Sequence, residues 1–198
     1  MTRDKNMRIE HMKTLIIYCH PKTAGHNPLI LEEITATLDK KGEEYKVLDL
    51  YHMKYDPVLH EEELEKQVIS NENKQIQKLI HDTEKLIFIY PIWWGTVPAL
   101  LKGFIDKIFT AGFAFKYVNG RPMGLLKGKK AAVFITSGSP KIFQVFLGHR
   151  YYKGMTRDIL GFCGITSRVF HIDNAMKVDE KQKEKIRKEV KKGLLWLN

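Results

Sequence analysis

Short apolar runs separated by mixed segments recur along the whole chain. Residues 14–19, 85–90 and 131–136 are almost continuously apolar, a pattern typical of strands buried on both faces of a sheet. Residues 45–50 alternate between apolar and polar positions, and residues 166–171 form one more run. The pattern therefore predicts five strands.

The segments between these runs have helical spacing. From residue 97 to residue 109, apolar side chains recur at helical intervals, while Lys102, Asp106 and Lys107 fall on the opposite face. Further helices are predicted over residues 27–41, 74–82, 151–162 and 179–197. Strands and helices that alternate in this way predict an α/β fold, with a five-stranded parallel sheet and helices on both faces.

The ends of the first helix carry their own signals. Asn27 or a neighbour can cap its start, Pro28 suits an early helical position, and Gly42 suits its end. Residues 56–73 are polar and are expected to form a long connection with one helical piece.

The chain has 198 residues, which is the size of one domain. We expect residues 13–198 to form this domain and residues 1–12 to be a flexible N-terminal extension. The N-terminus has no apolar signal core, and every apolar run is shorter than the roughly 20 residues of a membrane-spanning helix. These features predict a cytoplasmic protein without a transmembrane segment.

Neither the cysteines nor the histidines form a metal-binding pattern. Cys19 and Cys163 lie far apart without a CxxC pair, so we expect reduced, buried thiols. No two histidines have HExxH spacing, and no metal site is predicted. His171, at the end of the last strand, is expected to be a packed edge residue.

The formal net charge is +10, which favours anionic partners such as nucleic acid, a membrane surface or a phosphorylated cofactor. The densest lysine cluster, over residues 181–192, includes Glu184 and Glu189 in a helical pattern and reads as a solvated helix face. No patch interleaves basic and aromatic residues, so no nucleic-acid partner is predicted. Peripheral docking on a membrane stays open.

Ligands of parallel sheets bind beyond the carboxyl ends of the strands, so the loops after the first, third and fourth strands are expected to carry function. The first loop, residues 19–28, leads into a helix N-terminus, where free N–H groups attract phosphate. It contains neither GxGxxG nor GxxxxGK[ST]. Phosphate binding and an ordinary capped turn are both open. Its side-chain donors are His20, Lys22, Thr23, His26 and Asn27.

The other two loops suit a flat ligand. In the second, Trp93 and Trp94 have large rings with one polar edge, which suits the wall of a site or a cover for the sheet edge. Pro91 and Gly95 favour a shaped turn around them. The third loop, residues 136–140, exposes N–H groups that could bind a ring edge, although a plain turn explains it equally well.

Residues 90–117 (YPIWWGTVPALLKGFIDKIFTAGFAFKY) resemble the signature of flavodoxin-like NAD(P)H:quinone oxidoreductases. The resemblance also includes the His-Pro turn after the first strand, TSGS at residues 136–139 and GFCG at residues 161–164. It implies a flavodoxin-like homodimer that transfers hydride from NAD(P)H to a quinone-like acceptor by a ping-pong mechanism.

The resemblance also assigns roles to the three loops. It places the flavin ring against Pro91, Ile92, Trp93, Trp94 and Gly95, with Thr136, Ser137, Gly138 and Ser139 along the pyrimidine edge. It assigns the flavin phosphate to the first loop, with His20, His26 and Asn27 as the matching positions. Thr23 or the backbone would replace a missing hydroxyl, and Pro28 is also expected among the cofactor-binding residues. Gly25 stands where members of the family often have serine. FMN is favoured over FAD because the chain is short, whereas the choice between NADH and NADPH stays open.

The acceptor pocket is implied in the same way. Phe115 and Tyr117 match an aromatic pair that each subunit contributes to its partner's active site. The position of an active-site tyrosine falls on Phe143 or Gln144, so no tyrosine hydroxyl is expected there. His149 falls near a histidine that stabilises reduced flavin and is the predicted catalytic residue, with Arg150 as the alternative at that position.

Two other interpretations were weighed against this enzyme. A flavodoxin-type electron carrier is disfavoured, because such carriers are typically acidic and this chain is basic. A regulatory subunit that binds flavin or nucleotide and reports redox state to a membrane transporter is the alternative that the sequence leaves open.

Overall fold

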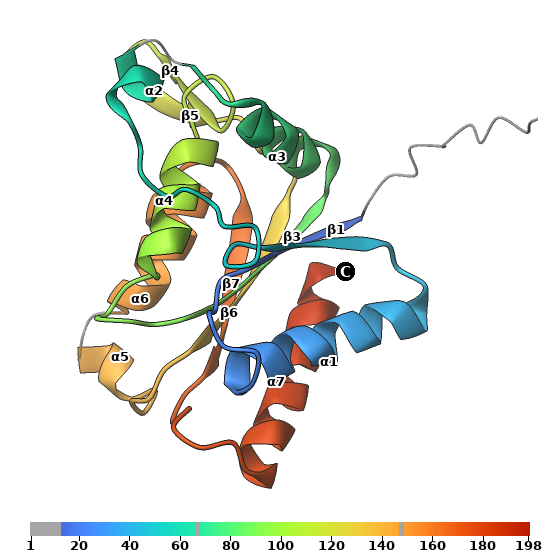
Figure 1. Cartoon of the computed structure of the whole chain (residues 1–198). Helices are drawn as coiled ribbons and strands as arrows, with labels where there is room; N and C mark the ends of the chain where they lie inside the picture. Colours follow the sequence, from blue (N-terminus) through green and yellow to red (C-terminus); the bar gives the residue numbers. More distant parts are fainter. Residues whose placement is uncertain (1–12, 66–67, 147–148) are drawn as a thin grey trace, which may run out of the picture.

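The fold was analysed in a computed structural model that describes residues 13–65, 68–146 and 149–198. Five parallel strands form one sheet in the order β2-β1-β3-β6-β7 (Figure 1). They are β1 (Thr14–Tyr18), β2 (Tyr45–Asp49), β3 (Lys85–Pro91), β6 (Lys130–Thr136) and β7 (Thr166–Ile172). All five predicted strands, and the parallel α/β architecture, are confirmed.

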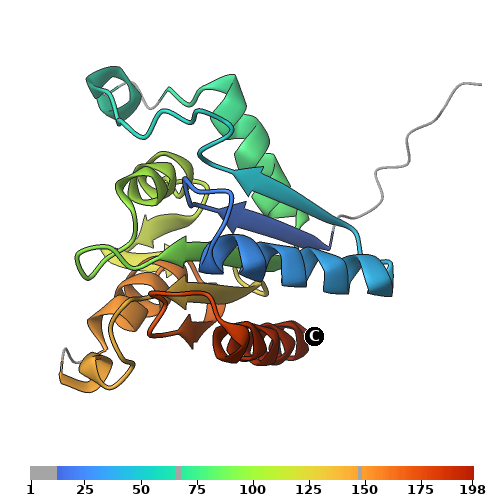
Figure 2. The same ribbon diagram turned by 60° about the horizontal axis from the view of Figure 1, so that its bottom comes forward.

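Helices cover both faces of this sheet (Figures 1 and 2). α1 (His26–Lys41) and α7 (Glu180–Leu197) lie side by side on one face. On the other face, α3 (Asn71–Asp82), α4 (Ala99–Ile108) and the π-helix η1 (Gly154–Gly161) pack against the strands. The short helices α2 (Glu61–Glu65), α5 (Phe143–Phe146) and α6 (Arg150–Lys153) lie in the connections.

The continuous apolar runs have a simple physical cause. In β1, Leu15 and Ile17 belong to the core under α3 and α4, while Ile16 and Tyr18 belong to the core under α1 and α7. Successive residues of a strand point to opposite faces, and here both faces are covered. Residues 15–18 of the strand are therefore all apolar or aromatic.

Three details differ from the sequence-based prediction. Asn27 does not cap α1, because the helix begins at His26 and its N-cap is Gly25. The helix predicted over residues 151–162 is divided into the α-helix α6 and the π-helix η1. A hairpin of β4 (Phe115–Val118) and β5 (Arg121–Gly124) was not predicted.

Three further expectations concern the N-terminus, the cysteines and membrane-spanning helices. The N-terminal extension predicted over residues 1–12 lies outside the described residues. Cys19 and Cys163 are free and buried, as expected. Within the described ranges, no helix combines the length and apolarity that crossing a membrane requires.

Candidate cofactor and active site

The three predicted loops meet at the carboxyl edge of the sheet, around a cleft of about 310 Å³. This volume lies within the usual range for small-molecule sites. The first loop, the end of β3 and the end of β6 each contribute to its wall, and the loop between β7 and α7 completes it. The lining residues are His20, Lys22, Ala24, Gly25, His26, Asn27, Pro91, Ile92, Trp93, Thr136, Ser137, Gly138, Ala175, Met176 and Val178.

The N-terminus of α1 opens into this cleft and carries unsatisfied polar atoms. Nε2 of His26 and Oδ1 of Asn27 are buried and have no hydrogen-bond partner within the described part of the chain. Burial lowers the pKa of His26, which keeps its imidazole neutral near pH 7. Buried polar groups are rarely left unpaired, so these two side chains have hydrogen-bonding capacity to spare next to the cleft.

Asn27 also joins two walls of the cleft. Its Nδ2 donates a hydrogen bond of 3.0 Å to Oγ1 of Thr136 at the end of β6. Both side chains are buried, at 2 % and 4 % exposure. The amide is therefore fixed in one orientation, with its oxygen left for a ligand donor.

The remaining first-loop residues are spread around this point. His20 lines the cleft, and its Nδ1 accepts a hydrogen bond of 3.2 Å from the backbone N–H of Lys22. Pro28 is half-buried in the first turn of α1, as its predicted early helical position requires. Thr23 is exposed and is not among the lining residues.

In the second loop, the two tryptophans differ. Trp93 lines the cleft and pairs with Thr96 across a tight turn, whereas Trp94 is fully exposed with a φ of 50°. Gly95 follows with a φ of 76°, a conformation that favours glycine. Neither tryptophan is buried in the sheet edge. The N–H of Ile92 donates to the carbonyl of Thr136 at 2.8 Å, which sets the second loop against the third.

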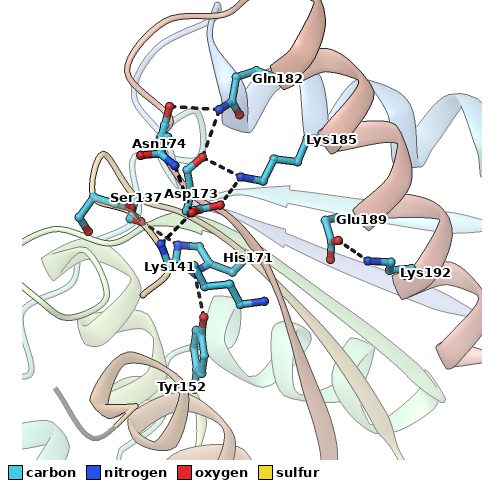
Figure 3. Close-up of polar contacts among 11 residues, drawn as sticks. Ser137, Lys141, Tyr152, His171, Asp173, Asn174, Gln182, Lys185, Glu189 and Lys192 are labelled. Carbon is cyan, nitrogen blue, oxygen red and sulfur yellow. Dashed lines mark hydrogen bonds and ion pairs between the residues drawn. The ribbon is translucent and has the colours of Figure 1, made fainter. Parts of the chain in front are cut away.

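Two residues that were not among the predicted site residues, His171 and Tyr152, support the third loop. Nε2 of His171 lies 2.7 Å from Oγ of Ser137, and Nδ1 of His171 lies 2.8 Å from the hydroxyl of Tyr152 (Figure 3). Burial lowers the pKa of His171 to about 4. His171 is packed at the end of β7 as expected, but the sequence carried no signal of its contact with Ser137.

The loop between β7 and α7 is fixed by charge and amide contacts (Figure 3). Asp173 pairs with Lys185 of α7 and accepts the backbone N–H of Lys141 at 2.7 Å. Gln182 donates to the carbonyls of Asp173 and Asn174, each at 3.2 Å. These contacts place Ala175 and Met176 at the wall of the cleft.

The predicted acceptor residues do not line this cleft. Phe115 and Tyr117 lie on the hairpin with their rings 5.9 Å apart, and Tyr117 is 64 % exposed. Phe143 is exposed on α5. His149 is exposed at the N-cap of α6, with a φ of 58° and its ring stacked on Tyr152 at 5.7 Å. Arg150 is exposed beside it.

Over 13–65, 68–146 and 149–198, no group of three or more His, Cys, Asp or Glu side chains could hold a metal ion.

Comparison with known proteins identifies the family. A family model described as "Flavodoxin-like fold" matches residues 12–194. An uncharacterized NAD(P)H oxidoreductase of Haemophilus influenzae is 33% identical over 171 residues, which cover 81% of this chain and 83% of that protein.

A second relative and a solved structure carry more specific names. NAD(P)H dehydrogenase [quinone] 1 of Cavia porcellus is 32% identical over 146 residues, which cover 64% of this chain and 53% of that enzyme. The structure of an FMN-dependent NADH-azoreductase from Bacillus anthracis, solved with FMN, superimposes with a TM-score of 0.79 at 21% identity. The superposition covers 94% of this chain and 99% of the azoreductase chain, and it shows that the two proteins share a fold.

The family match and the relative from Haemophilus influenzae each span most of the chain. Together with the parallel sheet and the cleft at its carboxyl edge, they show that the chain is an oxidoreductase and belongs to the flavodoxin-like NAD(P)H oxidoreductase family.

Proposed function

We propose that this chain is a flavin-dependent oxidoreductase that uses NAD(P)H to reduce quinone-like acceptors. The observation that carries the proposal is the N-terminus of α1 at the wall of the cleft, where His26 and Asn27 are lining residues and each has a buried polar atom without a partner. A bound flavin would supply the hydride chemistry, receiving two electrons from NAD(P)H and passing them to the acceptor in a ping-pong sequence.

The first loop would hold the flavin phosphate. Free backbone N–H groups at the start of α1 and the positive end of its dipole favour an anion there. His26, Asn27 and His20 would add side-chain hydrogen bonds, and Lys22 would add charge at the wall. Thr23 could take part only by moving toward the cleft, because it is exposed outside it.

The other loops would hold the flavin ring. Pro91, Ile92 and Trp93 provide a largely apolar wall, continued by Trp94 and Gly95 in the same turn. Thr136, Ser137 and Gly138 line the opposite edge, with Ser139 next in the loop. N–H groups along that edge would stabilise negative charge on the ring when it is reduced.

The acceptor pocket would be completed by a second copy of the chain. Tyr117 is exposed on the hairpin, so the chain itself does not use it in its core. We propose a homodimer in which Phe115 and Tyr117 of one copy cover the flavin of the other. Phe143 and His149 would lie on the acceptor side, with His149 or Arg150 supplying positive charge to the reduced flavin.

Three finer assignments follow the same proposal. FMN is the proposed flavin, with FAD as the alternative, and the net charge of +10 suits the extra phosphate of NADPH. Two free, buried thiols suit a reducing compartment such as the cytoplasm. The relatives are named as oxidoreductases, which gives no support to the alternative of a transporter's regulatory subunit.

A visible absorption spectrum tests this function. The purified protein is incubated with FMN or FAD, desalted and examined before and after addition of NADPH or NADH. Retained flavin that bleaches with either nucleotide, and recovers its colour on addition of a quinone, is the expected result. A protein that stays colourless with both flavins would overturn the proposal.

A further inference from the structure

His171 lies in the core of the molecule with both ring nitrogens engaged. It is 3 % exposed, at the end of β7, directly below the third loop of the cleft (Figure 3). Its Nε2 contacts Oγ of Ser137 at 2.7 Å, and its Nδ1 contacts the hydroxyl of Tyr152 at 2.8 Å. Ser137 lines the cleft, whereas His171 does not.

The directions of these two hydrogen bonds follow from a third one, which Ser137 makes with the backbone of Ser139. Oγ of Ser137 also lies 2.9 Å from the carbonyl oxygen of Ser139, and a carbonyl can only accept. The single hydroxyl hydrogen of Ser137 is therefore donated to Ser139. Ser137 must then accept from Nε2–H of His171, and Tyr152 must donate to the bare Nδ1.

The result is one directed chain that runs from Tyr152 through His171 and Ser137 to the backbone of Ser139. Burial favours the protonation states that this chain needs, because it lowers the pKa of His171 to about 4 and raises that of Tyr152 to about 12. If donor and acceptor exchanged roles in any one of these hydrogen bonds, two donors or two acceptors would face each other at the next bond.

The short helix α6, which carries Tyr152, also reaches the second loop. Tyr151, next to Tyr152 in α6, packs on Gly95 so closely that a Cβ at Gly95 would lie 3.2 Å from its ring. α6 thus contacts the tryptophan loop through Tyr151 and the serine loop through Tyr152 and His171. Both loops are walls that the proposed function assigns to the flavin ring.

We propose that His171, as the neutral Nε2–H tautomer, is a positioning residue that sets the conformation of residues 137–139 and thereby the pyrimidine-edge side of the flavin site. This inference rests on the proposed function, because the flavin is the ligand of that edge. His171 acts through Ser137 and does not touch the ligand itself.

Two isosteric substitutions separate this role from general packing. In H171Q the side-chain amide N–H can replace Nε2–H and still donate to Ser137. In H171N the amide oxygen can replace Nδ1 and accept from Tyr152, but the donor to Ser137 is lost. H81N, on the exposed face of α3, is the matched control.

The first measurement is made on the protein without flavin. Long-range ¹H–¹⁵N spectra of the histidine rings report the tautomer of His171, and backbone amide spectra report residues 138 and 139. We expect a protonated Nε2 in the wild type. At residues 138 and 139, we expect the amide chemical shifts to differ from those of the wild type more in H171N than in H171Q. An Nδ1–H tautomer, or equal shifts in both variants, would overturn the inference.

The second measurement is the Kd for FMN, from quenching of flavin fluorescence. We expect it to rise about tenfold in H171N, the equivalent of one hydrogen bond, and less than about threefold in H171Q and H81N. If H171N does not fold, S137A removes the acceptor of the same bond and should raise the Kd by a similar factor. Equal Kd values for H171N and H171Q would contradict the positioning role.

The two measurements also separate the two hypotheses. A wild-type protein with the expected tautomer and amide shifts that binds no FMN would overturn the proposed function, while His171 would still order the loop. A wild-type protein that binds and reduces FMN but shows the other tautomer would overturn only the role of His171.

Discussion

Gly25 is a residue whose backbone decides what its side chain can be. It is the N-cap of α1, with φ 126° and ψ −164°, a region that essentially only glycine occupies. A Cβ there would meet no atom within 4 Å, so space is not the constraint. A serine at this position, which the family resemblance leads one to expect, would therefore strain the backbone.

We expect G25A and G25S to lower the free energy of unfolding by a similar amount, on the order of 1–3 kcal/mol, because both must leave this backbone conformation or strain it. Denaturant titration measures the loss. Because the two variants differ only in the serine hydroxyl, comparison of their Kd values for FMN gives the contribution of that hydroxyl to FMN binding. A G25S protein as stable as the wild type would show that the loop accepts a side chain at this position without strain.

His171 makes stability depend on pH. Its folded-state pKa is lowered to about 4, whereas a histidine in the unfolded chain has a pKa near 6.5. Between these values the unfolded state binds more protons, so the free energy of unfolding decreases as pH falls through this window. The effect of His171 is at most on the order of 3 kcal/mol, and it is absent above about pH 7.

Urea titrations at several pH values between 4 and 7 measure this slope. H171Q removes the titrating group, so its stability should vary less over the same range than that of the wild type. His26, whose pKa is also lowered by burial, contributes in the same direction and remains in both proteins. Parallel curves for the two proteins would show that His171 is not held neutral.

At the scale of elements, the strands were predictable and some turns were not. Burial on both faces leaves a continuous apolar run, which is visible without any contact information. The hairpin was missed although Asn119 and Gly120, with φ values of 51° and 73°, form the Asn-Gly pair typical of such turns. The π-helix after α6 has no comparable signal in the sequence.

For the candidate site, the position of the cleft was predictable and the contacts between its side chains were not. Strand ends located the cleft, and the motifs located its three walls, because topology alone brings those loops together. The pairing of Asn27 with Thr136 and of His171 with Ser137 depends on contacts over 109 and 34 residues, which periodicity cannot report. Side-chain partners were therefore the part that needed a structure.

Helix α7 gives a prediction at the element scale. Gly193 faces the sheet, and a Cβ added there would lie 2.3 Å from Cζ of Phe134 in the core. Alanine normally stabilises a helix relative to glycine by about 1 kcal/mol. Here we expect G193A to destabilise the protein by about 1–3 kcal/mol, because Phe134 must move in a packed interior.

Thermal and denaturant unfolding measure this loss, with G154A as the control. Gly154 is also helical, with φ −54°, but a Cβ there meets no atom within 4 Å. Its substitution should be neutral or stabilising. If both variants gained stability, the contact between α7 and β6 would be looser than the structure shows.

The whole molecule divides into a covered sheet and a projecting hairpin (Figure 1). The cleft is built within one chain, from loops that a single copy brings together. The apolar side chains of the hairpin are different, since Tyr117 and Val118 are 64 % and 44 % exposed. Tyr117 and Val118 point to opposite faces of the strand, and an exposed aromatic ring such as that of Tyr117 suits contact with a partner.

Because of this division, substitution at the hairpin should separate assembly and acceptor reduction from flavin binding. We expect the wild type to sediment at twice the mass of the chain and Y117E to sediment as a monomer, since a carboxylate is costly to bury in an apolar interface. Y117E should keep its affinity for FMN and lose at least about tenfold in quinone turnover, a loss typical of an interface aromatic residue. K116E, on the alternate face of the same strand, places the same charge next to Tyr117 and should stay dimeric and active. A wild-type monomer with full turnover would show instead that one chain forms the complete active site.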